Sequence, residues 1–194
     1  MPNKIILASK SEVRKQILIK HGINCKVEPS NVDEESVKQS LIKEGATPEI
    51  ISKNLAELKA NKVSLKIVDE IVLGADSVID LDGKIISKPT SRNEALEILK
   101  KLNGKNHFLI SSVCLSKNGK MIWHYSDKAK LTMKNFEIFE LEDYLAKLTD
   151  KVLFAYNVYQ IEGAGKDLFL KIEGNENTIM GLPIEKIEEY LKNL

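Results

Sequence analysis

The sequence has few cysteines, few aromatic residues, no excess charge of either sign and no long hydrophobic run. Its two cysteines, Cys25 and Cys114, lie far apart without metal-ligand spacing, so we expect reduced thiols and a cytoplasmic location. Its 29 basic residues are balanced by 28 acidic residues, which disfavours binding to the phosphates of nucleic acid. No stretch approaches the roughly 20 apolar residues that a membrane-spanning helix needs. The sequence therefore predicts neither a nucleic-acid nor a membrane partner.

Strand and helix patterns alternate along the chain. Short apolar or alternating runs predict strands at 5–7, 26–27, 71–81, 84–88, 108–115, 121–125, 128–134, 158–161 and 168–172. Capping residues before apolar stripes predict helices at 11–22, 47–63, 91–104, 141–148 and 183–191. Because hairpins join some strands and helices join others, we expect an α/β or α+β fold with a mixed sheet. The absence of repeats and linkers predicts a single domain over residues 1–194, with a cleft between two lobes.

The most informative segment is the strand that ends at Asp76. An all-apolar run and two small residues precede this carboxylate, which places it where a buried strand meets a crevice. Pairing Leu81 with Lys84 across an Asp-Gly turn puts Lys88 opposite Ser77, beside Asp76. Two interpretations stay open. The pair is a structural ion pair at a sheet edge, or Asp76 activates water or holds a metal while Lys88 binds phosphate.

Other polar residues are candidates for binding an anion or a cation. Ser9, Ser11 and Arg14 surround the start of a predicted helix, where free N–H groups and hydroxyls can bind phosphate. Simple helix capping is the commoner explanation for such serines. Asp33 and Glu34 belong to an acidic segment. Such a segment is usually a solvated loop or a helix N-terminus, and the alternative is a Mg²⁺ site for a triphosphate.

Lys59 has an ordinary interpretation, whereas Glu162 allows an ordinary and a functional one. Lys59 lies beside the apolar face of its predicted helix, where a lysine usually extends its head into solvent. Glu162 comes just before a glycine-rich turn. In a pocket, its carboxylate could accept hydrogen bonds from the N1–H and 2-amino groups of guanine and would repel a uracil carbonyl. The alternative is an ordinary exposed glutamate at the end of a strand.

These segments, in this order, resemble the Maf family of nucleoside triphosphate pyrophosphatases. The resemblance spans nearly the whole chain in eight short motifs. They are Leu7-Ala8-Ser9-x-Ser11 with Arg14; Val32-Asp33-Glu34; Leu55-Ala56-x-x-Lys59-Ala60; Gly74-Ala75-Asp76-Ser77; Asp82-Gly83 with Lys88-Pro89; Leu102-x-Gly104-x-x-His107; Tyr159-x-Ile161-Glu162-Gly163; and Gly181-Leu182-Pro183.

The resemblance implies a fold like that of inosine triphosphatases, with a mixed, curved sheet, flanking helices and two lobes around a central cleft. It also implies hydrolysis of a nucleoside triphosphate, here a non-standard or modified one, to its monophosphate and pyrophosphate. The implied cofactor is a divalent cation, Mg²⁺ or Mn²⁺, and a homodimer is one implied assembly. By position, Asp76 resembles the proton acceptor. The residues that resemble phosphate contacts are Ser9, Ser11, Arg14, Lys59 and Lys88, and those that resemble metal ligands are Asp33, Glu34 and Asp76.

The base preference is implied by three positions, Val13, Ser77 and Glu162. Members that resemble the dTTP/UTP branch carry Arg, Thr and Gln at these places. Members that resemble the 7-methyl-GTP branch carry Trp, Gln and Glu. Only Glu162 matches the second branch, which favours a guanine-type or modified base, and a dTTP/UTP-preferring pyrophosphatase stays open.

The chain also departs from the family pattern in ways that keep another function open. Glu12 and Val13 stand where many members have proline and arginine, and a lysine common in the family is absent from the segment 155–159. The alternative is a regulatory protein that senses a nucleotide in the same pocket without turning it over.

Overall fold

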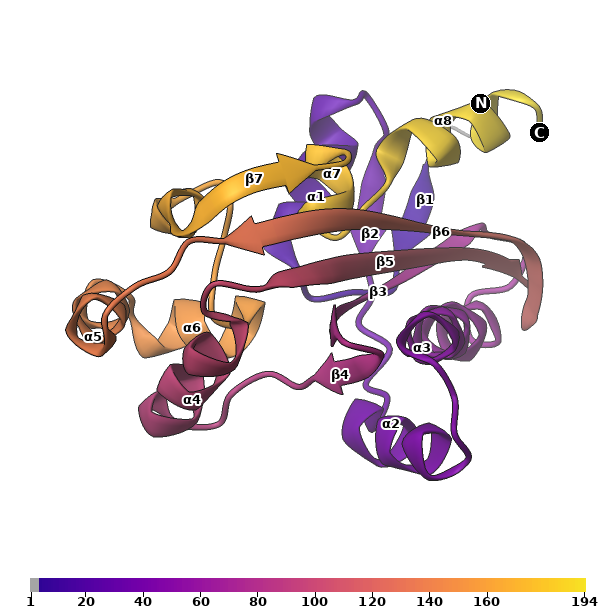
Figure 1. The fold of residues 1–194 in the computed structure, drawn as a ribbon. Coiled ribbons are helices and arrows are strands. Elements are labelled where there is room, and N and C mark those ends of the chain that lie inside the picture. The colour runs from indigo at the N-terminus through magenta and orange to yellow at the C-terminus, as the bar shows by residue number, and fades with distance from the viewer. Residues whose placement is uncertain (1–3) are drawn as a thin grey trace.

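The computed structural model describes residues 4–194, apart from the side chains of Ala155 and Tyr156. Within this range the centre is a seven-stranded mixed sheet ordered β2-β1-β3-β5-β6-β7, with β4 paired to β3 (Figure 1). β1 runs parallel to β2 and β3, and the other neighbours are antiparallel. This confirms the predicted α/β fold. The strands are β1 (Ile5–Leu7), β2 (Cys25–Val27), β3 (Val72–Leu81), β4 (Lys84–Ile86), β5 (Asn106–Lys117), β6 (Lys120–Met133) and β7 (Phe169–Glu173).

Helices cover both faces of the sheet. On one face, α1 and α8 pack with alternate residues of β1, β3 and β5, and α3 packs on the opposite face (Figure 1). At the other end of the long strands, α4, α5 and the η1 turn enclose a further cluster. The helices are α1 (Glu12–Lys20), α2 (Glu34–Lys43), α3 (Pro48–Ser64), α4 (Arg92–Leu102), α5 (Ile138–Ala146), α6 (Asp150–Tyr156), η1 (Ala164–Leu168), α7 (Glu176–Ile179) and α8 (Ile184–Lys192). In the part of the chain described, no helix is long and apolar enough to cross a membrane.

The capping residues place the helices as the sequence predicts. The hydroxyl of Ser11 accepts the N–H of Arg14 at the start of α1, and Thr47 caps α3 with Pro48 in its first turn. Ser91 caps α4 in the same way. Local side-chain chemistry therefore fixes where the polypeptide leaves the sheet and enters each of these helices.

The strands differ from the prediction in two regions. The segments 121–125 and 128–134 are one continuous strand, β6, because β5 pairs with it along nearly its whole length and a bulge absorbs the irregularity. Residues 158–161 form no strand. Val158, Tyr159 and Ile161 are buried in the core as an irregular segment, so burial and not pairing explains their apolar character.

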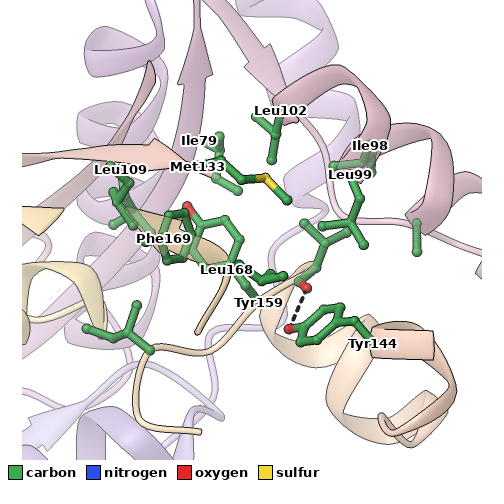
Figure 2. Packing of buried hydrophobic residues seen from close by; sticks show 14 of the residues in the cluster. Ile79, Ile98, Leu99, Leu102, Leu109, Met133, Tyr144, Tyr159, Leu168 and Phe169 are labelled. Carbon is green, nitrogen blue, oxygen red and sulfur yellow. Dashed lines mark hydrogen bonds between the residues drawn. The ribbon is translucent and has the colours of Figure 1, made fainter. Parts of the chain in front are cut away.

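Part of the core is built around Tyr159. Its ring meets that of Phe169 edge to face, with ring centroids 4.8 Å apart, and Leu168 and Leu109 lie nearby (Figure 2). The hydroxyl of Tyr144 donates to the carbonyl of Val158 at 3.0 Å, shown as a dashed line in Figure 2. These contacts tie the irregular segment after α6 to the sheet.

Gly74 lets α3 pack directly on β3. A Cβ at this position would overlap the carbonyl oxygen of Ala56 and approach the amide nitrogen of Ala60 to 2.7 Å. Since both contacts are backbone atoms of one helix, neither can move alone. The absence of a side chain at Gly74 therefore sets how closely α3 approaches the strand that carries Asp76.

His107 is buried in the same core as Tyr159. It is 1% exposed, its Nε2 lies 2.9 Å from the Tyr159 hydroxyl, and its Nδ1 has no hydrogen-bond partner in the described structure. Burial lowers the pKa of His107 from 6.5 to about 4. The ring is therefore neutral in the native protein at pH 5, where the unfolded chain is largely protonated at this position.

We expect Gly74→Ala to lower the free energy of unfolding by roughly 2–4 kcal/mol, because the added methyl group must separate α3 from β3. Urea denaturation measures the change. Gly163→Ala is the matched control, because a Cβ there comes no closer than 3.9 Å to any neighbour. Equal stability of the Gly74 variant and the native protein would contradict the packing described.

We expect the free energy of unfolding to fall as the pH drops from 6.5 towards 4, because protons bind the unfolded chain at His107 and not the folded one. Between pH 7 and pH 5 this residue alone accounts for about 2 kcal/mol. Urea denaturation of the native protein and of His107→Gln at both pH values tests this. An unchanged pH dependence in the variant would refute the assignment.

Candidate active site

A cavity of about 1260 Å³ is lined by all the residues that the sequence proposes for catalysis, substrate binding, metal binding and specificity. Its size suits a nucleotide. Its walls come from the loop before α1, the start of α2, the middle of α3, the strands β3 and β4 with the segment after them, and the segments after α6 and α7. Folding therefore gathers these residues in one place, while the role of each stays a prediction. They are Ser9, Ser11, Val13, Arg14, Asp33, Glu34, Lys59, Asp76, Ser77, Lys88 and Glu162.

Asp76 lies within β3 with its side chain on the α3 face, 8% exposed. Its Oδ1 accepts a hydrogen bond from the Lys59 ammonium at 2.8 Å. Its Oδ2 is buried and has no hydrogen-bond partner in the described structure. The backbone carbonyl of Asp76 accepts from the Ser52 hydroxyl at 3.1 Å. One oxygen of this carboxylate is thus fixed, and the other has the capacity to accept a further group.

Lys59 joins two carboxylates across the cavity. Its ammonium lies 2.8 Å from Asp76 Oδ1 and 2.9 Å from Glu34 Oε2, and its side chain is 6% exposed. The interpretation of Lys59 as a solvent-exposed lysine was therefore wrong. A buried ammonium requires such partners, because an unpaired charge away from water is costly.

Arg14 directs its guanidinium at protein acceptors. Its Nε donates to the carbonyl of Gly181 at 2.9 Å, and its Nη1 donates to the carbonyl of Ala75 at 2.9 Å. Its Nη1 also reaches Ser9 Oγ at 3.3 Å, and its Nη2 reaches Ser77 Oγ at 3.0 Å. The arginine predicted to contact phosphate thus links three separate segments of the wall.

Lys88 lies in the segment after β4. The pairing of Leu81 with Lys84 is as predicted, but the ladder ends at the pair Ile79 and Ile86, so Lys88 is not a strand partner of Ser77. Burial lowers the pKa of Lys88, and the charge of Arg14 lowers it further. Lys88 nevertheless belongs to the same charge cluster as Asp76.

The two acidic residues predicted to bind metal at the start of α2, Asp33 and Glu34, make different contacts. Both carboxylate oxygens of Asp33 accept from Ser36, where Asp33 caps α2. Glu34 follows in the first turn of the helix, half exposed and bound to Lys59. Among the described residues, no group of three or more His, Cys, Asp or Glu side chains is arranged to hold a metal ion.

Glu162 is exposed at the cavity wall, where its carboxylate accepts from the side-chain amide of Gln160 at 3.3 Å. Val13, the second position implicated in base preference, lines the same cavity from α1. The segment 155–159, which lacks a lysine common in the family, includes Ala155 and Tyr156. The side chains of these two residues lie outside the described part of the structure.

Sequence reasoning missed several residues of the site. Ser52 fixes the backbone of Asp76, and Ser111 contacts Ser77 with their hydroxyl oxygens 2.8 Å apart. Both are buried serines in regular elements, and no local pattern marks them. Phe154 lines the cavity from α6, a helix that the sequence analysis did not predict.

Comparisons with solved structures place the fold. The chain resembles the Ham1 protein of Staphylococcus aureus with a TM-score of 0.51 and 13% identity, covering 98% of each chain. It resembles a HAM1 protein of Coxiella burnetii with a TM-score of 0.52 and 12% identity, covering 98% of this chain and 99% of that one. At such low identity the likeness supports a shared fold alone.

Sequence comparisons identify much nearer relatives. The chain is 70% identical over 192 residues to a Pelagibacter ubique protein named nucleoside triphosphate pyrophosphatase, covering 99% of this chain and 98% of that protein. It is 40% identical over 194 residues to a Bartonella quintana protein named 7-methyl-GTP pyrophosphatase, covering 100% and 97%. The family model described as "Maf-like protein" matches residues 4–194. The chain therefore belongs to the Maf-like protein family.

Proposed function

We propose that this protein is a nucleoside triphosphate pyrophosphatase in which Asp76 is the proton acceptor. The observation that carries the proposal is the unpartnered, buried Oδ2 of Asp76, which lies in a nucleotide-sized cavity lined by basic side chains. The relative with 70% identity over almost the whole of both chains carries this activity in its name, which supports the same reaction class here.

In the proposed reaction, Asp76 Oδ2 accepts a proton from the water that attacks the α-phosphorus. The new bond forms between the water oxygen and the α-phosphorus. The bond between the α-phosphorus and the oxygen that bridges to the β-phosphate breaks, and pyrophosphate leaves with its electron pair. Lys59 holds Asp76 through Oδ1, which leaves Oδ2 available for the water. Positioning of the attacking group beside a fixed base lowers the barrier without any movement of the protein.

The phosphates are bound at the end of the cavity where Lys59 and Lys88 lie. Ser9 and Ser11 line the same cavity, and their hydroxyls already take part in the turn into α1, which orients them. Positively charged side chains held in place stabilise the charge that builds up on the leaving pyrophosphate. The charge cluster therefore has the composition that a triphosphate requires.

Asp76 and Glu34 are the residues that would hold a divalent cation, Mg²⁺ or Mn²⁺. The half-exposed carboxylate of Glu34 fits a hard cation, which prefers oxygen ligands. Asp76 Oδ2 has two lone pairs, so it could contact the cation with one and the attacking water with the other. Asp33 fits less well, because helix capping engages both of its oxygens. When bound, the cation would neutralise phosphate charge.

We further propose a guanine-type or modified base, recognised through Glu162. Its carboxylate lies on the cavity wall and can accept two hydrogen bonds from a guanine edge. The names of relatives do not separate the candidates, since proteins with 36–40% identity carry both the general name and the 7-methyl-GTP name. A preference for dTTP or UTP is the competing outcome.

A panel of nucleoside triphosphates with Mg²⁺ or Mn²⁺, assayed for pyrophosphate and monophosphate, tests the reaction. We expect turnover of at least one substrate. We expect Asp76→Asn to lower kcat by about 10²–10⁴-fold, because the amide cannot accept the proton.

The matched control is Asp80→Asn, on the same strand but outside the cavity, where Asp80 accepts the N–H of Gly83 in the turn. This variant should keep native turnover. Tight nucleotide binding without pyrophosphate release from any substrate would instead support a sensor. Near-native turnover by a folded Asp76→Asn variant would remove Asp76 from the reaction.

We expect Glu162→Gln to reduce kcat/KM for guanine-type substrates relative to pyrimidine substrates by about 10-fold, because it removes one charged acceptor. The ratio of kcat/KM values between substrates is the measurement. Glu142→Gln, an exposed carboxylate on α5 outside the cavity, should leave the ratio unchanged. A constant ratio in the Glu162 variant would exclude this residue from base recognition.

A further inference from the structure

The guanidinium of Arg14 has little capacity left for a substrate. Four hydrogen bonds run from it to protein atoms, which are the carbonyls of Gly181 and Ala75 and the hydroxyls of Ser9 and Ser77. A guanidinium has five N–H donors, so these contacts occupy most of them. The charge predicted to bind phosphate is therefore already engaged within the protein.

A chain of hydroxyls continues from Arg14 across the sheet. Ser111 Oγ donates to the carbonyl of Thr178 at 2.7 Å, which uses its single proton. The 2.8 Å contact between Ser77 and Ser111 must then have Ser77 as donor, and Ser77 accepts from Arg14. The direction of every bond in this chain is thus fixed.

The chain closes into a ring through the segment after α7. The N–H of Gly181 donates to the same carbonyl of Thr178 at 3.0 Å, and the carbonyl of Gly181 accepts from Arg14. The ring joins α1, β3, β5 and α7. A Cβ on Gly181, whose φ is +94°, would approach Ser77 Oγ and the Arg14 guanidinium to 3.0–3.2 Å, so the ring is closely packed.

Through Arg14, this ring is hydrogen-bonded to β3 on both sides of Asp76. Arg14 binds the carbonyl of Ala75 and the hydroxyl of Ser77, the two residues that flank the carboxylate. Side chains alternate along a strand, so Ser77 faces the α1 side while Asp76 faces Lys59 on the α3 side. Arg14 therefore restrains the backbone of Asp76 from the face opposite to its carboxylate.

We propose that Arg14 is a positioning residue for Asp76, and that the ring through Ser77, Ser111 and Thr178 holds its guanidinium in place. This inference rests on the proposed function, because it assigns Arg14 a role in the same reaction. A planar guanidinium reaches acceptors in several directions at once, whereas a lysine ammonium offers its donors from one point. The positioning role therefore requires arginine and not merely a positive charge.

Arg14→Lys and Arg14→Met separate positioning from phosphate binding. Steady-state kinetics with the preferred substrate of the native enzyme should show kcat lowered by on the order of 10²-fold in both variants, with KM changed less than about 3-fold. Retention of most of kcat by Arg14→Lys, with KM raised mainly in Arg14→Met, would overturn the proposal in favour of phosphate binding.

Ser111→Ala tests the ring without touching the arginine, and decides the matter if the Arg14 variants do not fold. We expect kcat to fall by about 10-fold with KM nearly unchanged. Ser116→Ala is the matched control. Ser111 and Ser116 are both fully buried on β5 and each donates one hydrogen bond of 2.7 Å, but Ser116 bonds to Asn61, outside the ring.

Equal kcat values for the Ser111 and Ser116 variants would overturn the role of the ring. Thermal unfolding of both variants shows whether their losses of stability match, so that a change in kcat alone reports on positioning. Assay of the native enzyme separates failure of the proposed function from failure of this inference alone. Absence of pyrophosphate from the native protein would refute the proposed function and this inference with it, whereas an active native enzyme with an active Arg14→Lys variant would refute only the inference.

Discussion

The buried ion pair between Asp76 and Lys59 is the interaction on which the arrangement of the site depends. It joins the middle of α3 to the end of the apolar part of β3, and Glu34 adds a second carboxylate from α2. Desolvation makes an isolated charge at this depth costly, so each partner requires the other. Gly74 makes the pair attainable, because it lets α3 lie directly on the strand two residues before Asp76. The geometry of this charge cluster thus follows from how closely one helix packs.

Successive side chains of β3 point to opposite faces of the sheet, so the two faces make different contacts. Asp76 faces α3 and its lysine, whereas Ala75 and Ser77 are held from the α1 side by Arg14. A single strand therefore carries the carboxylate proposed to react on one face, and on the other face the serine that Arg14 holds. Gly181, which lines the cavity in the segment after α7, is joined to Arg14 through its carbonyl.

Local chemistry made much of the fold predictable from the sequence. Caps such as Ser11 and Thr47, and the pairing of Leu81 with Lys84 across a tight turn, depend on neighbouring residues and were correct. α2 was missed because its short apolar stripe, Val37 and Leu41, is only partly buried and stands among polar residues. The segment 158–161 was mistaken for a strand because its apolar residues serve burial without pairing. Within the site, the partners of Arg14 lie up to 167 residues away, so no local pattern could show that its donors are engaged.

The most direct test of the central claim is a crystal structure with Mg²⁺ and a triphosphate analogue whose bond between the α- and β-phosphates resists hydrolysis. We expect the α-phosphate beside Asp76 Oδ2, the remaining phosphates near Lys59 and Lys88, and Arg14 still bound to Gly181 and Ala75. A phosphate chain bound away from Asp76, or an Arg14 guanidinium that leaves its carbonyls to bind phosphate, would contradict it.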